Sequence, residues 1–235
     1  MERSQFIDIV RGVDVLLMVT FNCSVTLSYF RLTQPSNNFL YWSVFPIIIA
    51  SIFIFLSGTS AYASYKSRKK EFEKRYLKRG VKLLVFSAAI TLFTYVFVPS
   101  ATILFGILHF FAITSFVVPF FVKNKKIIFL AGVLIILLGL YLQTKQFDFS
   151  YLLWLGLVPK NFLTLDYFPI MPWFGVLLLG VYFGKDFLKK TANIKFKNKF
   201  ANIFTFFGKN SLVIYLVHQP ILVVLLFVLG FRLYV

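Results

Sequence analysis

The sequence contains two histidines, His109 and His218, and each lies inside a long apolar run. An imidazole can take a proton from a nucleophile, donate a hydrogen bond or bind a metal. Ser211, Tyr215 and His218 are spaced i, i+4 and i+7, which places them on one face of a helix. Pro220 favours a kink just beyond them. This pattern is typical of a cavity wall, where each histidine is either a catalytic base or an interhelical hydrogen-bonding group.

Charged residues also stand at the start of the first apolar run, in the stretch FIDIVRGVDVLLMVTFN. Asp8 and Asp14 each lie three residues from Arg11, so on a helix either carboxylate can reach the guanidinium. Asn22 follows Arg11 by eleven residues, about three turns and about 16 Å along the same face. Charges at membrane depth are costly and mark functional sites. An arginine in this place can also be a snorkelling topology anchor.

A third polar group belongs to the stretch LDYFPIMPWFG, in which Asp166 is the only acid. Two prolines stiffen this stretch, and Trp173 suits the headgroup region of a bilayer. Asp166 either contacts a substrate or caps the helix that follows it. We therefore regard Asp166, Trp173 and Tyr215 as candidate substrate-binding residues.

Other kinds of chemistry lack support in the sequence. There is no phosphate-cradling glycine loop, and the G-x-S-x-G, H-E-x-x-H and C-x-x-C motifs are missing. The two histidines and one cysteine, Cys23, argue against a zinc site, so we expect no metal. Any chemistry must then lie inside the apolar part of the chain.

The elements that must position these residues are membrane helices. The chain is 59% hydrophobic and 14% charged, against about 45–50% and about 25% in soluble domains. Apolar runs of about 20 residues cross the hydrocarbon as helices. Residues 185–200, where Lys alternates with apolar side chains, form either an interfacial helix or a solvated loop. We predict an all-α polytopic membrane helix bundle that forms one domain over residues 1–235, with about seven spans at residues 7–30, 40–65, 81–98, 101–122, 127–143, 168–183 and 210–231.

The net charge of +17 is distributed unevenly along the chain. Residues 66–82, 123–126 and 185–209 hold nine, three and seven Lys or Arg, and with Arg3 and Arg11 they place 21 of the 25 on one side. Cationic loops face the cytoplasm. This predicts a multi-pass protein of the cell membrane with a cytoplasmic N-terminus and an external C-terminus. We attribute the charge to contact with anionic membrane lipids rather than to nucleic acid.

Five stretches together resemble a known family. They are IDIVRG with Asn22 beyond it, SIFIFLSGTS, LFGILHFFA, DYFPIMPWFGVLLLG and FGKNSLVIYLVHQP, in this order. They are similar to stretches in bacterial and archaeal relatives of heparan-alpha-glucosaminide N-acetyltransferase, within the transmembrane acyltransferase superfamily. The resemblance covers nearly the whole chain, and its last two stretches are the most specific.

The resemblance implies CoA-dependent O- or N-acyl transfer, in the simplest case of an acetyl group, from cytoplasmic acyl-CoA to a sugar or glycan acceptor. By position, Arg11 and Asp8 match the motif arginine and its acidic neighbour, and we expect them to bind the donor together with Asp14. The cationic mouth of the first span would attract the CoA phosphates. Acyl-CoA is then the co-substrate that this chain requires.

The same resemblance assigns the catalytic group to His109, His218 and Asn22. A deep histidine would take the acceptor's proton, and Asn22 would stabilise the developing oxyanion. Many relatives have a histidine at the position of Asn22, and the lysosomal enzyme has a catalytic histidine just past its first span. This chain reads YFRLTQPSNN there, so either His109 or His218 substitutes as the base, or the chain is not an acetyltransferase.

Two other functions stay open at this point. Polar residues at several depths also suit a transporter of a small glycan or lipid-linked molecule, although no inverted repeat is visible. The missing first-span histidine suits a non-catalytic membrane subunit. In each case the chain can form a homo-oligomer.

Overall fold

The structure is a computed structural model that describes residues 4–34, 37–194 and 196–231. Three cations that contributed to the predicted orientation, Arg3, Lys195 and Arg232, lie outside the described residues. The C-terminal end of the chain, which we predicted to be external, lies outside them as well. The orientation in the membrane therefore stays a prediction.

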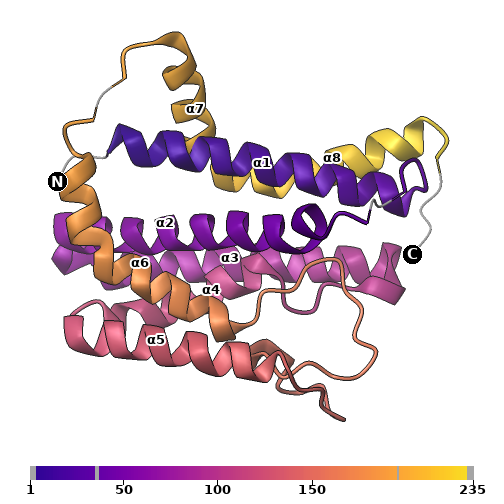
Figure 1. Ribbon diagram of the computed structural model, residues 1–235, viewed down its shortest axis with the longest axis horizontal. Coiled ribbons are helices and arrows are strands. Elements are labelled where there is room, and N and C mark those ends of the chain that lie inside the picture. The colour runs from indigo at the N-terminus through magenta and orange to yellow at the C-terminus, as the bar shows by residue number, and fades with distance from the viewer. Residues whose placement is uncertain (1–3, 35–36, 195, 232–235) are drawn as a thin grey trace. The chain divides into compact units, whose positions relative to one another are not determined.

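The described residues fold into helices joined by turns and extended segments (Figure 1). Five of these helices are long and apolar enough to cross a membrane: α3, α5, α6, α8, and α2 together with the π-helical turn Leu40–Val44 before it. This confirms the all-helical class and the membrane character, while the number of spans stays a prediction. The bounds are α1 Gln5–Tyr29, α2 Phe45–Ser67, α3 Phe72–Phe97, α4 Ile107–Phe121, α5 Lys125–Leu142, α6 Ile170–Thr191, α7 Lys199–Lys209 and α8 Ser211–Val228.

Helix α4 is shorter than the span predicted over residues 101–122. Its 15 residues rise about 22 Å, less than the roughly 30 Å of a hydrocarbon core. The chain before α4 is extended and lies parallel to the chain before α6. Leu165 N donates to Ala101 O at 3.1 Å, and Phe168 N donates to Phe105 O at 3.0 Å. These bonds satisfy backbone groups that a longer helix would have paired internally.

The basic residues 185–209 contain two helix ends with a turn between them. Helix α6 extends to Thr191, and α7 begins at Lys199. Asn198 caps α7, because its Oδ1 accepts a hydrogen bond from Ala201 N at 2.8 Å. Of the stretch 185–200, for which the sequence allowed an interfacial helix or a solvated loop, residues 185–191 end α6, residues 199–200 begin α7, and the described residues between them are not helical. The contact of this stretch with the membrane stays a prediction. Helix α3 likewise continues back into the basic segment that precedes it.

The chain divides into two compact units, and each is considered by itself. One unit is Ser57–Asp186, which holds α3, α4 and α5 with parts of α2 and α6. The other consists of Glu2–Leu56 and Phe187–Val235, which holds α1, α7 and α8 with the remaining parts of α2 and α6. The predicted single domain over residues 1–235 stays a prediction.

Glycines bring the helices of Ser57–Asp186 close together. A Cβ on Gly58 of α2 would collide with the carbonyl of Leu177 in α6. A Cβ on Gly175 of α6 would lie 2.5 Å from the carbonyl oxygen of Gly132 in α5. Close backbone approach through small residues is the usual way in which helices associate inside a bilayer. Helix α6 therefore contacts both α2 and α5 within this unit, while α3 packs against α4.

In the second unit, α1 packs against α7 and α8 (Figure 1). A Cβ on Gly12 would collide with the carbonyl of Phe204, and a Cβ on Gly208 would collide with the carbonyl of Asp8. Two glycines on facing helices thus keep α1 and α7 in backbone contact. Because Asp8, Arg11 and Gly12 lie within two turns, this contact also fixes the start of α1 where the charged residues stand.

We expect Gly12→Ala and Gly208→Ala each to lower the thermal midpoint of the purified protein. The added methyl meets a backbone carbonyl, and overpacking of this kind costs roughly 1–3 kcal/mol, although alanine by itself favours a helix over glycine by about 1 kcal/mol. Melting in detergent measures the change, with Val13→Ala at a neighbouring exposed position as the control. A higher midpoint in both glycine variants would contradict the close packing of α1 and α7.

Candidate functional site

Asn22 and His218 meet where α1 packs against α8. Asn22 Nδ2 lies 3.1 Å from His218 Nε2, and both side chains are half-buried. The two residues are 196 positions apart in the sequence. The structure therefore brings together two of the three side chains that the sequence placed in the catalytic group.

Backbone carbonyls of α8 determine which nitrogen of His218 carries the hydrogen. Nδ1 lies 2.8 Å from the carbonyl oxygen of Tyr215 and 3.1 Å from that of Ile214. A carbonyl can only accept, so Nδ1–H is the donor. In the neutral ring, Nε2 then has a lone pair, and it accepts from the amide of Asn22. The basic nitrogen of His218 thus faces α1.

Of the other two members of the predicted α8 face, Tyr215 contacts this histidine. The Tyr215 ring centroid lies 5.8 Å from that of His218, with the two planes tilted by 54°. Ser211 is the first residue of α8 and is buried. Tyr215 therefore contributes both a carbonyl and a ring to the surroundings of His218.

Arg11 and Asp8 stand near the start of α1. Arg11 is half-buried, and its Nη2 donates to the carbonyl of Leu56 in α2 at 3.1 Å. Asp8 is buried in the first turn of α1, where a negative charge is favourable with respect to the helix dipole. Arg11 is thus fixed to a neighbouring helix within the same unit.

The side chain of Asp14 has no hydrogen bond to any described residue. Its side chain is 2% exposed, and neither carboxylate oxygen has a hydrogen-bond partner among the described residues. The direct hydrogen bond to Arg11 that the spacing allowed is not formed. A buried polar group without a partner is costly, so Asp14 is a position where a donor from outside the chain would be stabilising.

His109 belongs to Ser57–Asp186 and has partners at both ring nitrogens. Gly106 N donates to Nδ1 at 3.3 Å, and Nε2 lies 3.1 Å from Thr91 Oγ1. Thr91 Oγ1 in turn donates to the carbonyl of Ile103 at 2.8 Å. Because Nδ1 accepts, Nε2 is the donor in the neutral ring. Each donor in this chain of bonds has an acceptor, and the chain joins the first turn of α4 to α3.

Asp166 caps a helix, but not the helix that the sequence suggested. Its Oδ2 accepts from the backbone N–H of Ile107, the first residue of α4, at 3.0 Å. The sequence allows two roles for Asp166, contact with a substrate or a cap on the helix that follows it. The parallel pairing of the two extended segments brings the carboxylate to α4 instead, where it satisfies an unpaired N–H and favours the helix dipole.

Trp173 lies in the first turn of α6, with its ring centroid 5.2 Å from that of Phe168. Nearby, Tyr167 OH donates to the carbonyl of Leu153 at 2.9 Å, and burial raises the pKa of the Tyr167 phenol. These contacts order the segment between α5 and α6. The roles of Asp166 and Trp173 in acceptor binding stay predictions.

The predicted site residues fall into two groups. Those in the second unit are Asp8, Arg11, Asp14, Asn22, Tyr215 and His218. Those in the first unit are His109, Asp166 and Trp173. Within the second unit, hydrogen bonds join α1 to α8 at Asn22 and α1 to α2 at Arg11. Among the described residues, no group of three or more His, Cys, Asp or Glu side chains could hold a metal ion.

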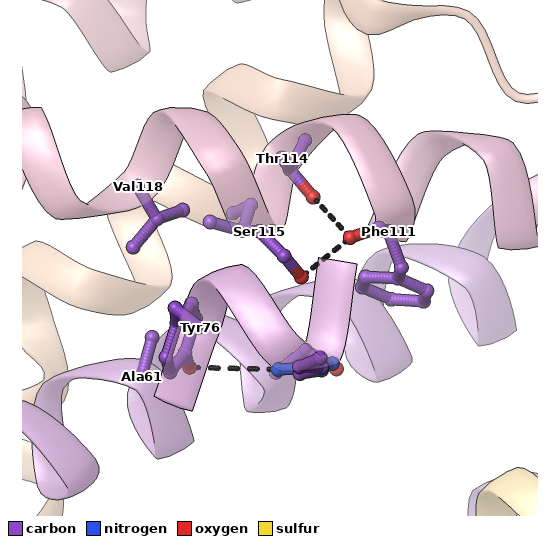
Figure 2. A pocket seen from close by; sticks show the side chains of 9 residues that line it. Ala61, Tyr76, Phe111, Thr114, Ser115 and Val118 are labelled. Atoms are coloured by element: carbon purple, nitrogen blue, oxygen red, sulfur yellow. Dashed lines mark hydrogen bonds between the residues drawn. The ribbon is translucent and has the colours of Figure 1, made fainter. Parts of the chain in front are cut away.

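The sequence reading missed a small cavity in the first unit, which we call the Arg79 cavity (Figure 2). It has a volume of about 10 Å³, room for about one water molecule. Tyr76, Arg79, Phe111 and Ser115 are among the residues that line it. The available signal was the i, i+3 spacing of Tyr76 and Arg79 directly before Gly80, but Arg79 entered the sequence analysis only as one of many cations.

Comparison with known proteins bears on this site. A family model described as heparan-alpha-glucosaminide N-acetyltransferase, catalytic, matches residues 3–220. Comparison with curated proteins gave no match, and neither did comparison with solved structures. The matched range includes all nine predicted site residues.

We expect His109→Ala to lower the thermal midpoint, because it removes the acceptor for Gly106 N–H and the donor to Thr91. Buried groups left unsatisfied cost about 1–3 kcal/mol each. His109→Gln should retain most of the stability, because glutamine at this position of a helix start can also accept from the N-cap N–H. The thermal midpoints of both variants measure the effect, and they are compared with that of Thr91→Val, which removes the hydroxyl partner of the network. Wild-type melting of His109→Ala would show that the network does not stabilise the fold.

Proposed function

The chain belongs to the heparan-alpha-glucosaminide N-acetyltransferase catalytic family, and from this premise we propose that it transfers an acetyl group from acyl-CoA to an amine or hydroxyl of a sugar acceptor at the Asn22–His218 pair. The observation that carries the proposal is the 3.1 Å contact between Asn22 Nδ2 and His218 Nε2. The contact supplies a base and an amide donor at one point. Family membership supports the reaction class, and the pair supports its place in the chain.

In the proposed reaction, the acceptor's N–H or O–H hydrogen-bonds to His218 Nε2 beside the Asn22 amide. The acceptor heteroatom attacks the thioester carbonyl carbon while Nε2 takes its proton. The tetrahedral intermediate carries a negative oxygen, which the Asn22 N–H stabilises. Collapse breaks the C–S bond, and the departing CoA thiolate takes the proton from the imidazolium. The products are the acetylated acceptor and CoA, and His218 returns to its initial state.

In this mechanism, backbone carbonyls of α8 orient the imidazole of His218, as a carboxylate does in other enzymes. In a Ser-His-Asp triad, the acid holds the imidazole tautomer and stabilises the imidazolium. Here Nδ1–H keeps its bonds to the carbonyls of Tyr215 and Ile214 in both protonation states. His218 can therefore act without a carboxylate partner, and it supplies the base that this chain lacks in its first span.

The charged residues at the start of α1 bind the acyl donor in this proposal. Arg11, held by the carbonyl of Leu56, attracts the donor phosphates, and Asp8 lies one turn before it. An amide or hydroxyl of the donor would satisfy the buried carboxyl of Asp14, which has no hydrogen-bond partner among the described residues. Tyr215, Asp166 and Trp173 are proposed acceptor contacts.

We expect His218→Ala to lower acetyl transfer by roughly 10²–10⁴-fold, the usual contribution of a general base. Asn22→Ala should lower it by roughly 10²-fold through loss of an oxyanion donor. Transfer of radiolabelled acetyl from acetyl-CoA to a panel of amino sugars measures both effects. His109→Gln is the matched control, because it removes the other imidazole, and it should keep the rate within a few-fold.

Two results would contradict this assignment. Normal transfer by His218→Ala together with loss in a stably folded His109→Gln would move the base to His109. A wild-type protein that binds acetyl-CoA but transfers to no sugar amine or hydroxyl in the panel would instead be a non-catalytic member of the family.

We also propose that the basic segments face the cytoplasm, so that acyl-CoA reaches the protein from that side. Helix α5 is a candidate span, and Asn124 and Thr144 are exposed residues at its two ends. In a Cys23→Ala background, Thr144→Cys should react with an impermeant maleimide on intact cells. Asn124→Cys should react only after permeabilisation, because lysines flank it. The reverse labelling pattern would place the donor site outside.

A further inference from the structure

We propose that the Arg79 cavity is a second ligand site, which binds a phosphate group. It belongs to Ser57–Asp186, whereas Asn22 and His218 belong to the other unit. Neither the proposed acetyl transfer nor the family match assigns a role to Arg79. Three features of the described residues carry the inference: the way the guanidinium is held, its lack of a counter-ion, and the size of the void beside it.

The guanidinium is held mainly by aromatic rings. Arg79 Cζ lies 5.5 Å from the ring centroid of Tyr76 and 5.8 Å from that of Phe111, distances at which cation–π attraction is significant. A guanidinium has five N–H donors. Among the described residues, its one hydrogen bond is from Nη1 to Tyr76 OH at 3.5 Å, which is long and therefore weak. The rings fix the side chain and leave most of its donors for a ligand.

Arg79 also has no counter-ion. No carboxylate of the described residues lies within ion-pair distance of it. Glu73 on the same helix is paired with Lys123 at 2.8 Å, and this hydrogen bond and the Glu73 charge raise the pKa of the Lys123 ammonium. The segment 66–82 holds nine Lys or Arg. A half-buried guanidinium without an anion is unfavourable, so an anionic ligand would be stabilised there.

The size of the void selects the part of the anion that can enter. A volume of about 10 Å³ admits one oxygen atom, about the size of a water molecule, while the rest of the ligand stays at the mouth. Figure 2 shows the hydroxyl of Ser115 directed to the carbonyl of Phe111, at 2.6 Å. This hydroxyl can rotate and donate to an incoming oxygen. A phosphate oxygen would then meet Arg79 and Ser115 together, a donor set that suits phosphate better than a neutral sugar.

Two sources can supply a phosphate group to this site. One is the nucleotide part of a CoA molecule that binds within Ser57–Asp186, and that choice rests on the proposed function for the presence of CoA. The other is the headgroup of an anionic lipid, which collects beside basic helix ends. Both present the same chemistry to Arg79, so the experiment must separate them.

The test uses the full chain in nanodiscs and compares Arg79→Gln with Arg75→Gln. Arg75 lies one turn earlier on α3 and is exposed, so its variant removes the same charge outside the cavity.

In phosphatidylcholine nanodiscs we measure the Kd of CoA and of pantetheine, which lacks the nucleotide. In nanodiscs that also contain phosphatidylglycerol, native mass spectrometry counts the anionic lipids retained. We expect Arg79→Gln to weaken CoA binding about tenfold, as loss of one charge-assisted pair does, with pantetheine unchanged and Arg75→Gln within twofold of wild type.

The outcomes separate cleanly. Unchanged CoA binding with a retained phosphatidylglycerol lost only in Arg79→Gln would identify the phosphate as a lipid headgroup and support the site. Equal effects of Arg79→Gln and Arg75→Gln, or no effect of either on both ligands, would overturn it. If Arg79→Gln does not fold, Arg79→Lys and Ser115→Ala decide by the same comparison. Binding is measured without turnover, so an inactive protein that still shows this pattern contradicts the proposed function but not the phosphate site.

Discussion

The hydrogen bond between Asn22 and His218 is the interaction on which the candidate chemistry depends. A hydrogen bond between membrane helices is worth only about 0.6–2 kcal/mol, so it cannot by itself bring α1 and α8 together. Apolar and backbone contacts do that. Phe30, the residue directly after α1, packs on Phe227 of α8 with ring centroids 5.4 Å apart, and Gly12 holds α1 against α7. The hydrogen bond then determines the orientation of two polar side chains that this packing has already placed close together.

The two imidazoles show how local backbone geometry separates a structural histidine from a candidate base. At the start of α4, Nδ1 of His109 accepts a hydrogen bond from the N–H of Gly106, and Nε2 donates to the hydroxyl of Thr91. Within α8, Nδ1 of His218 donates to carbonyls of the preceding turn, so Nε2 is the acceptor. The neutral tautomers are therefore opposite. An acceptor molecule could replace a side-chain amide at His218, whereas at His109 it would have to displace bonds that close a helix start.

Sequence patterns predicted the helical membrane class because hydropathy depends on composition, and composition alone excludes a soluble core. They also identified Asn22 and His218 individually, since a polar group in a long apolar run is costly wherever it lies. They did not predict that the two residues touch, because contact between the first and last helices depends on packing. The shortened α4 had a local signal in Pro99 and Gly106, which a hydropathy window does not register. No local sequence signal indicated the cap by Asp166, since its partner Ile107 lies 59 positions away.

The spacing of two residues on a helix predicts whether their side chains can meet, but not whether they are buried or what else they contact. The charged residues show this difference. Asp8 and Asp14 are equally distant from Arg11 in sequence, yet Asp14 has no hydrogen bond among the described residues. Arg79 is equivalent to its neighbours in a charge count, yet it borders a cavity and has no carboxylate partner in the described part of the chain. One unit thus contains a carboxyl that lacks donors, and the other contains a guanidinium that lacks an anion. The two groups belong to different units, and each by itself is a reason to look for a ligand in its own unit. The buried carboxyl of Asp14 would be stabilised by a hydrogen-bond donor, and the half-buried guanidinium of Arg79, which the rings of Tyr76 and Phe111 stabilise only in part, would be stabilised by an anion.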